Sequence, residues 1–269
     1  MIDACLVLCS FARRVADRIS LLPRLGWEDS WRHNAGRGIV AGLLDTGFDE
    51  QLQDFAGADL VTRDFRSAQP RSAEISEHGT HSVATLVGQG HQAIRGIAPA
   101  ARLLVAQVAG SDGIAKPRAV VEAFAWLISL GAKIVIIPLG EARERNEIAE
   151  QVEQGAARGV LFFAAAGNGY PQPIAFPARH PLAIAVGGAD DSGNLLPECS
   201  RLPRLDLVAP GWKIAGPIRN GVVSRRSGTS VACIVAAGAA MLALSAKAFP
   251  VDSSPRTSIL SELCRDVTA

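Results

Sequence analysis

Uninterrupted apolar runs recur along the chain and predict strands that are covered on both faces. They occupy residues 38–45, 102–108, 133–139, 160–166 and 182–188. Two stretches between them space their apolar residues as a helix does, one from Pro117 to the residue before Gly131 and one over 141–158, before Gly159. This alternation of strand and helix predicts an α/β fold in which helices flank a mainly parallel central sheet.

The composition is that of a globular domain. The chain has 269 residues, 48% of them hydrophobic, which is enough for a single domain, 1–269, with a large core. Lys and Arg number 27 against 26 for Asp and Glu, giving a net charge of +1 without a long run of like charge. Nucleic acid is therefore not an expected partner.

The first 35 residues are expected to form a helical or edge segment of the same domain. Their apolar patch at 4–12 follows Asp3 and lacks a small-residue cleavage pattern, which is not typical of a signal peptide. Even the stretch 231–246 falls short of the ~20 residues that a transmembrane helix needs, so no membrane partner is expected. The five cysteines, Cys5, Cys9, Cys199, Cys233 and Cys264, show no metal-ligand clustering, which favours reduced thiols in the cytoplasm.

Three polar residues stand where the active residues of parallel α/β sheets gather, beyond the carboxyl ends of strands. Asp45 closes the first predicted strand, and His78 and Ser230 each begin a stretch rich in Ala and Val. Each also has a purely structural interpretation, as a strand-ending turn or a helix cap. His81, one turn after His78, could pair with it in a metal site, but that interpretation needs a third ligand, and no HExxH-type carboxylate accompanies the pair.

Together these residues supply what acyl transfer needs. A serine hydroxyl becomes a good nucleophile when an imidazole takes its proton, and a buried carboxylate holds that imidazole in the useful tautomer. The segments "DTGFD" (45–49), "HGTHSVA" (78–84) and "SGTSVA" (227–232) resemble the three signature segments of the subtilisin-like serine proteases, the S8 family, in that family's order. Segments 95–108, 164–169, 174–190 and 205–211 also resemble the family's, so the likeness covers about 36–267.

This resemblance implies a three-layer subtilisin-like fold and a serine endopeptidase. Ser230 would attack the peptide carbonyl, His78 would act as general base and then general acid, and Asp45 would orient the imidazole. Asn168 and the backbone N–H of Ser230 would bind the oxyanion. A lipase or esterase would instead carry G-x-S-x-G, with the acid between serine and histidine.

The resemblance also implies where an extended peptide would bind, by pairing with backbone at 110–115 and at 139–140. The walls of the first specificity pocket would come from 138–140 and 165–167, and its floor from the short loop 170–176. Pro138 stands where the family often has serine and offers no N–H. The expected substrate-binding residues are Gly110, Ser111, Gly113, Leu139, Gly140, Ala165, Ala166 and Gly167.

Two departures from the family pattern bear on cofactors and redox chemistry. After Ser230 the chain has Cys233 and Ile234 where the family usually has a small residue and proline. For Cys233 we favour a role in helix packing over one in redox sensing. The segment 87–96 lacks the asparagine-bearing insertion of many calcium-binding relatives, and Asp54 alone matches one ligand. We therefore expect no cofactor and no obligatory calcium.

The segment before the first motif favours intracellular processing. Only 44 residues precede Asp45, too few for a folded pro-domain, so none is expected. The chain resembles the compact subtilisin-like proteases of cyanobactin pathways, which implies removal of a leader from a ribosomally made peptide precursor (RiPP), by hydrolysis rather than acyl transfer. Two alternatives stay open: a regulatory or defence protease acting on one partner protein, and a catalytically silent domain that binds peptides.

Overall fold

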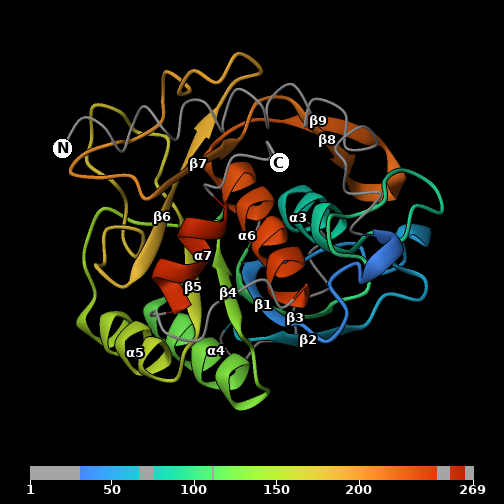
Figure 1. Cartoon of the computed structure of the whole chain (residues 1–269), viewed down its shortest axis with the longest axis horizontal. Coiled ribbons are helices and arrows are strands. Elements are labelled where there is room, and N and C mark those ends of the chain that lie inside the picture. Colours follow the sequence, from blue (N-terminus) through green and yellow to red (C-terminus); the bar gives the residue numbers. More distant parts are fainter. Residues whose placement is uncertain (1–30, 67–75, 111, 247–254, 264–269) are drawn as a thin grey trace.

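The computed structural model describes residues 31–66, 76–110, 112–246 and 255–263 (Figure 1). Most of the expected N-terminal segment lies outside these residues, as do Ser111 and three of the cysteines: Cys5, Cys9 and Cys264. No helix within the described residues is both long enough and apolar enough to cross a bilayer.

A seven-stranded sheet in the order β2-β3-β1-β4-β5-β6-β7 forms the centre of the fold. Its strands are β1 (Val40–Thr46), β2 (Leu60–Asp64), β3 (Arg102–Ala109), β4 (Ile134–Ile137), β5 (Leu161–Ala165), β6 (Ala183–Ala189) and β7 (Leu207–Pro210). All six pairings are parallel, so the expected α/β sheet is confirmed. A separate antiparallel hairpin joins β8 (Ile214–Pro217) to β9 (Val223–Arg226).

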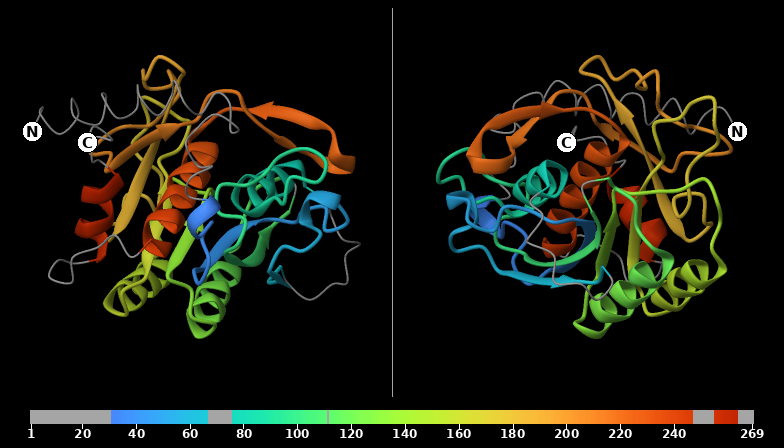
Figure 2. Two further views of the ribbon diagram at one scale, coloured as in Figure 1. Left: turned by 45° about the vertical axis from the view of Figure 1, so that its right-hand side comes forward. Right: turned by 180° about the vertical axis from the view of Figure 1, so that it is seen from behind.

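Helices cover both faces of the sheet and complete three layers (Figures 1 and 2). On one face lie α3 (Glu77–Val87), α6 (Thr229–Ser245) and α7 (Pro255–Leu263), and on the other α4 (Pro117–Ser129) and α5 (Asn146–Ala157). Two short 3-10 helices, η2 (Gln53–Phe55) and η3 (Arg219–Gly221), lie in the loops.

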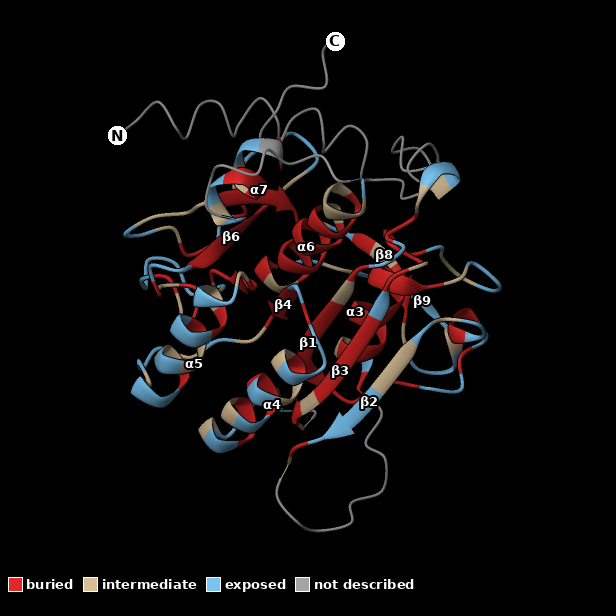
Figure 3. Cartoon of the chain, turned by 60° about the horizontal axis from the view of Figure 1, so that its bottom comes forward, coloured by how far each residue is buried: buried red, intermediate tan, exposed pale blue. Residues whose placement is uncertain are grey.

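Successive side chains of each strand point to opposite faces of the sheet. Leu43 and Phe163 belong to the core beneath α3 and α6, whereas Leu44 and Phe162 belong to the core beneath α4 and α5. Because both faces are covered, the central strands are buried along their length (Figure 3). This explains why their sequences are continuous apolar runs.

The helix predicted over 141–158 begins later in the structure, at Asn146. Glu141 instead pairs with Phe176, with its N–H 2.9 Å from that residue's carbonyl oxygen and its own oxygen 2.8 Å from that residue's N–H. The first residues of the predicted helix therefore pair with the segment between β5 and β6, and the predicted helix start was wrong by five residues.

Candidate active site

Asp45 lies at the carboxyl end of β1, a central strand, and is fully buried. Its Oδ1 accepts hydrogen bonds from the backbone N–H of Thr46 (2.6 Å) and from the Thr46 hydroxyl (3.1 Å). That hydroxyl also accepts from the N–H of Gly79, 3.1 Å away. Thr46, whose role was not predicted from the sequence, thus ties the carboxylate to the first turn of α3.

His78 is the second residue of α3 and reaches back to Asp45. Its backbone N–H donates to the hydroxyl of the N-cap residue Ser76, at 3.2 Å. Gly79 lets the helix approach the strand end, because a β-carbon there would lie 2.5 Å from the carbonyl oxygens of Thr46 and Gly47. As a result, Nδ1 of His78 lies 2.7 Å from Oδ1 of Asp45.

The two side chains perturb each other's protonation. Burial acts to raise the pKa of Asp45, but the charge of His78 and the hydrogen bonds from His78 and Thr46 outweigh it, so the pKa is lowered. The charge of Asp45 raises the pKa of His78, against burial and against the positive charge of Arg226. With Asp45 holding Nδ1–H, the exposed side of the imidazole presents Nε2 as a base.

Ser230 is the second residue of α6, whose N-terminus is held against the end of β5. The backbone N–H of Thr229 donates to Oδ1 of Asn168 (2.9 Å), and the Thr229 hydroxyl accepts from the N–H of Gly167 (3.0 Å). Gly228 has φ 133°, and a β-carbon there would lie 3.1 Å from Nδ2 of Asn168. These contacts orient the Asn168 amide, with its nitrogen beside the start of α6.

The structure brings the two halves of this site together by packing α3 against α6 (Figure 1). Asp45 and His78 form one bonded pair, and Asn168 and Ser230 are joined through Thr229. No hydrogen bond links His78 to Ser230 among the described residues, an arrangement that is common before substrate binds.

An apolar pocket of about 360 Å³ opens beside the loop between β3 and α4. Its rim includes Gly113, Leu139 and Gly140, three of the expected substrate-binding residues, and Ile114, which is 72% exposed. Its floor is made of buried aliphatic side chains: Leu44, Val108, Val120, Ile137 and Ile148. The pocket can take a large apolar side chain.

The expected walls of the first specificity pocket, here called the slot, include Gly140 and Gly167, and both glycines lie against Ala175. The methyl group of Ala175 sits between them, because a β-carbon on Gly140 would come within 2.9 Å of it and one on Gly167 within 3.3 Å. The N–H of Ala175 donates to the carbonyl of Ala166 at 2.8 Å. Ala165 and Ala166 are buried, so Gly140, Gly167 and Ala175 provide the accessible surface of this slot.

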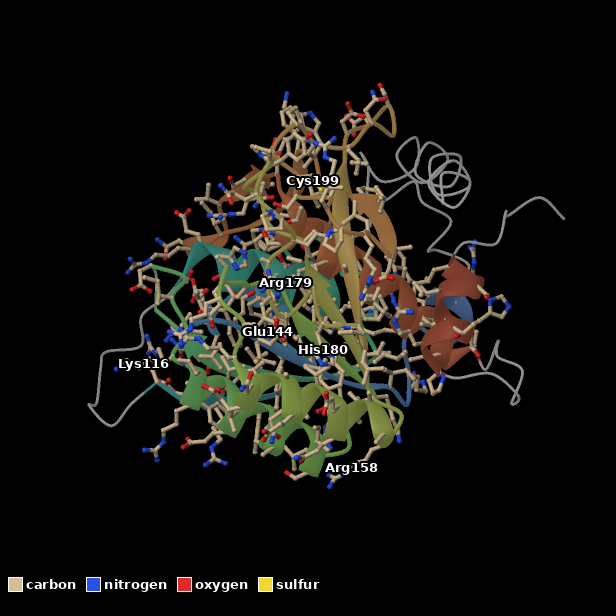
Figure 4. All side chains as sticks on the ribbon, turned by 90° about the vertical axis from the view of Figure 1, so that its left-hand side faces the viewer. Lys116, Glu144, Arg158, Arg179, His180 and Cys199 are labelled. Carbon is tan, nitrogen blue, oxygen red and sulfur yellow. The ribbon has the colours of Figure 1, made fainter. Side chains whose placement is uncertain are left out.

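Arg179 fixes the loop that carries Ala175. Its guanidinium donates to the carbonyl oxygens of Ile174 (3.0 Å) and Ala142 (3.2 Å) and lies 4.0 Å from the carboxylate of Glu144 (Figure 4). It therefore links the floor of the slot to the wall that follows β4.

His81 is buried and contacts the β8–β9 hairpin. Its Nε2 lies 3.0 Å from the carbonyl oxygen of Ile214, and burial lowers its pKa to about 4. Because that oxygen is an acceptor, Nε2 carries the proton and is not available to a metal ion. In the described part of the chain, no group of three or more His, Cys, Asp or Glu side chains is arranged to hold a metal.

The carboxylate of Asp54 is occupied by the backbone of a loop. Its oxygens accept from the N–H groups of Gln92 and Ala93, each at 2.8 Å. N–H donors stand where a cation would need oxygen ligands.

Cys233 in α6 is a fully buried free thiol, and burial raises its pKa. These properties agree with a packing role for this cysteine.

A family model, curated sequences and solved structures all match this chain to the same protein family. The family model described as the subtilase family, peptidase S8, matches residues 36–263. Subtilisin BL from Lederbergia lenta is 30% identical over 210 residues, 77% of this chain and 76% of its own length. The solved structure of prenylagaramide maturation protease PagA is 28% identical, with a TM-score of 0.74, over 83% of this chain and 82% of that one. A serine-to-alanine mutant of the protease domain of PatA is 29% identical, with a TM-score of 0.72, over 79% and 81%.

Proposed function

The chain belongs to the subtilase family and is a subtilisin-like serine endopeptidase, and we propose that Asp45, His78 and Ser230 form its catalytic triad. The observation that carries this proposal is the 2.7 Å hydrogen bond from Nδ1 of His78 to the buried Asp45. It fixes the imidazole in the tautomer that can take a proton at Nε2.

In this reaction Ser230 Oγ attacks the scissile carbonyl carbon while its proton passes to Nε2 of His78. The tetrahedral intermediate then expels the amine, which takes the proton from His78, and an acyl-enzyme on Ser230 remains. Water repeats the sequence, again losing its proton to His78, and releases the acid. Asp45 stabilises the imidazolium in both halves and stays ionised, in keeping with its lowered pKa.

We place the oxyanion between Nδ2 of Asn168 and the backbone N–H of Ser230. The bond from Thr229 N–H to Oδ1 of Asn168 supports this, because it commits the oxygen of the amide and leaves the nitrogen for the substrate. The N-terminus of α6 adds a positive dipole end at the same point. Removing one oxyanion donor typically costs about 100- to 1,000-fold in kcat.

The substrate is an extended peptide whose acyl part lies between the loop at 110–115 and residues 139–140. The slot closed by Ala175 favours a small residue on the acyl side of the scissile bond. The apolar pocket beside Gly113 and Leu139 favours a large apolar residue further toward the amino terminus of the substrate.

The natural substrate we propose is a ribosomally made peptide precursor from which a leader is hydrolysed. Support comes from PagA, a prenylagaramide maturation protease at 28% identity, and from the PatA protease domain at 29%. Free thiols at Cys199 and Cys233 are compatible with the cytoplasmic location that such processing implies.

This function is tested by incubating the purified chain with a library of peptides in water enriched in ¹⁸O and sequencing the products by mass spectrometry. Selective hydrolysis predicts one set of cleavage sites, with ¹⁸O in the new carboxyl group, and no products from Ser230→Ala. A folded wild-type chain that yields no products would favour a silent peptide-binding domain. Cleavage at unrelated sites would contradict selective processing.

A further inference from the structure

Positive charge is concentrated in the segment that leads into the candidate nucleophile. Residues 207–245 contain no Asp or Glu but four cationic residues, Lys213, Arg219, Arg225 and Arg226. All four lie on or beside the β8–β9 hairpin, and the last of them precedes Ser230 by four positions. The near-neutral chain therefore carries a locally basic element at its active site.

Along β9, alternate residues face in different directions. Val223 and Arg225 are exposed, whereas Ser224 and Arg226 are half-buried. The Arg225 guanidinium turns back onto its own hairpin and donates to the carbonyl of Lys213, at 3.0 Å. Arg226 is thus the arginine of β9 that faces into the molecule, toward α3.

Arg226 contacts the residue that immediately precedes the candidate general base. Its Nη2 lies 2.8 Å from a carboxylate oxygen of Glu77, and its positive charge lowers the pKa of both His78 and His81. The leaving amine must lie against His78, which gives it a proton. Groups that border His78 away from Asn168 therefore border the part of the substrate that follows the scissile bond.

The guanidinium has hydrogen-bonding capacity left over. Its Nε is buried and has no hydrogen-bond partner among the described residues, and its side chain is 30% exposed. Its partner Glu77 is 54% exposed, and an ion pair this open to solvent contributes little to stability. A guanidinium presents a fork of donors that suits a carboxylate.

We propose that Arg226 is a specificity-determining residue that binds an acidic side chain, Asp or Glu, in the first residue after the scissile bond. The inference rests on the proposed function, because it assumes that the leaving group passes His78. Glu77 holds the guanidinium in place in the free enzyme and competes with the substrate for it. The substrate of this site is then a peptide with an acidic residue just beyond the cleavage point.

The test compares fluorogenic peptides that differ only in that residue, Glu against the isosteric Gln. The wild-type chain should show kcat/KM about tenfold higher for the Glu peptide, as expected for a hydrogen bond between charged groups. Arg226→Ala should bring the ratio near one. Glu77→Gln should raise the ratio, because it removes the competing carboxylate. Arg225→Ala, on the opposite face of β9, is the matched control and should leave the ratio unchanged.

Covalent labelling by a fluorophosphonate tests the nucleophile Ser230 separately from the role of Arg226. Labelling of Ser230 supports the proposed function whatever the role of Arg226. The inference is overturned if the Glu-to-Gln ratio of kcat/KM is the same in the wild type and Arg226→Ala, or if it falls equally in Arg225→Ala. If the peptides bind without being cleaved, the degree to which each one slows labelling of Ser230 measures its binding. The preference for the Glu peptide over the Gln peptide is then read from binding instead of from kcat/KM. If Ser230 in the folded chain is not labelled, the proposed function fails and this inference fails with it.

Discussion

Nδ1 of His78 lies 2.7 Å from Oδ1 of Asp45, where the first turn of α3 meets the carboxyl end of β1. The contact depends on a third residue, Thr46, whose hydroxyl donates to the carboxylate and accepts from the N–H of Gly79. The strand end and the helix start are therefore joined as one unit, which holds a general base in register with the sheet.

The pH dependence of activity should reflect the raised pKa of His78. The imidazole must be neutral to take a proton, so kcat/KM should rise with pH and reach half its maximum above 6.5, the ordinary value for histidine. Because Arg226 lowers this pKa, Arg226→Gln should move the profile to higher pH, whereas Arg225→Gln should not. A profile that moves to lower pH in Arg226→Gln would contradict the assigned electrostatics.

Acid should destabilise the fold through His81. Its pKa is about 4 in the folded chain and 6.5 ordinarily, so the unfolded state binds the extra proton in that window. The stability is present above pH 6.5 and is lost as pH falls toward 4, by ~3 kcal/mol. His81→Gln keeps a donor for Ile214 and does not titrate. Thermal unfolding should therefore show a flatter dependence of Tm on pH for this variant, and equal slopes would refute the assignment.

Chelation should leave the stability of the protein unchanged. Both oxygens of Asp54 already hold backbone N–H groups, so EDTA is expected to leave Tm where it is. Asp54→Asn should lower stability by ~1–3 kcal/mol, because one amide oxygen replaces a carboxylate that accepts from three backbone N–H groups, those of Gln92, Ala93 and Ile94. Asp59→Asn is the control, since its ion pair with Arg102 is exposed. A marked fall of Tm in EDTA would show that a metal contributes to the fold.

The size of the slot should set the residue accepted before the scissile bond. Ala175→Gly removes the methyl group between Gly140 and Gly167 and should raise kcat/KM for a larger apolar residue relative to Ala by ~10-fold, the order expected for one or two methylenes in an apolar pocket. The measurement is a series of peptides varied at that position. An unchanged order of preference would place the specificity pocket elsewhere.

Much of the architecture follows from the apolar runs. The runs at 102–108 and 182–188 correspond to β3 and β6, and Pro117 starts α4 as predicted. The short edge strand β2 was not predicted, because Thr62, Arg63 and Asp64 give it an exposed and mixed pattern. The hairpin β8–β9 was also missed, since its strands of four residues are too short to show a period.

The sequence predicts which residues belong to the candidate site, but not the contacts that hold them in place. The motifs placed Asp45, His78, Asn168 and Ser230, but the bonds made by Thr46 and Thr229 depend on how distant segments meet. The threonines beside Asp45 and Ser230 in the motifs were the available signal. Ala175 and Arg226 carried no signal, because the roles we propose for them depend on contacts with Gly140 and Glu77, which lie far away in the sequence.

The most direct test of the triad is labelling of the purified chain by a fluorophosphonate probe, with the modified residue mapped by mass spectrometry. We predict labelling confined to Ser230 in the wild type, none in Ser230→Ala, and a rate lower by about 10⁴-fold in Asp45→Asn. Circular dichroism would establish that each variant is folded. Wild-type labelling at another residue, or an undiminished rate in Asp45→Asn, would contradict the assignment of Asp45, His78 and Ser230 as the catalytic triad.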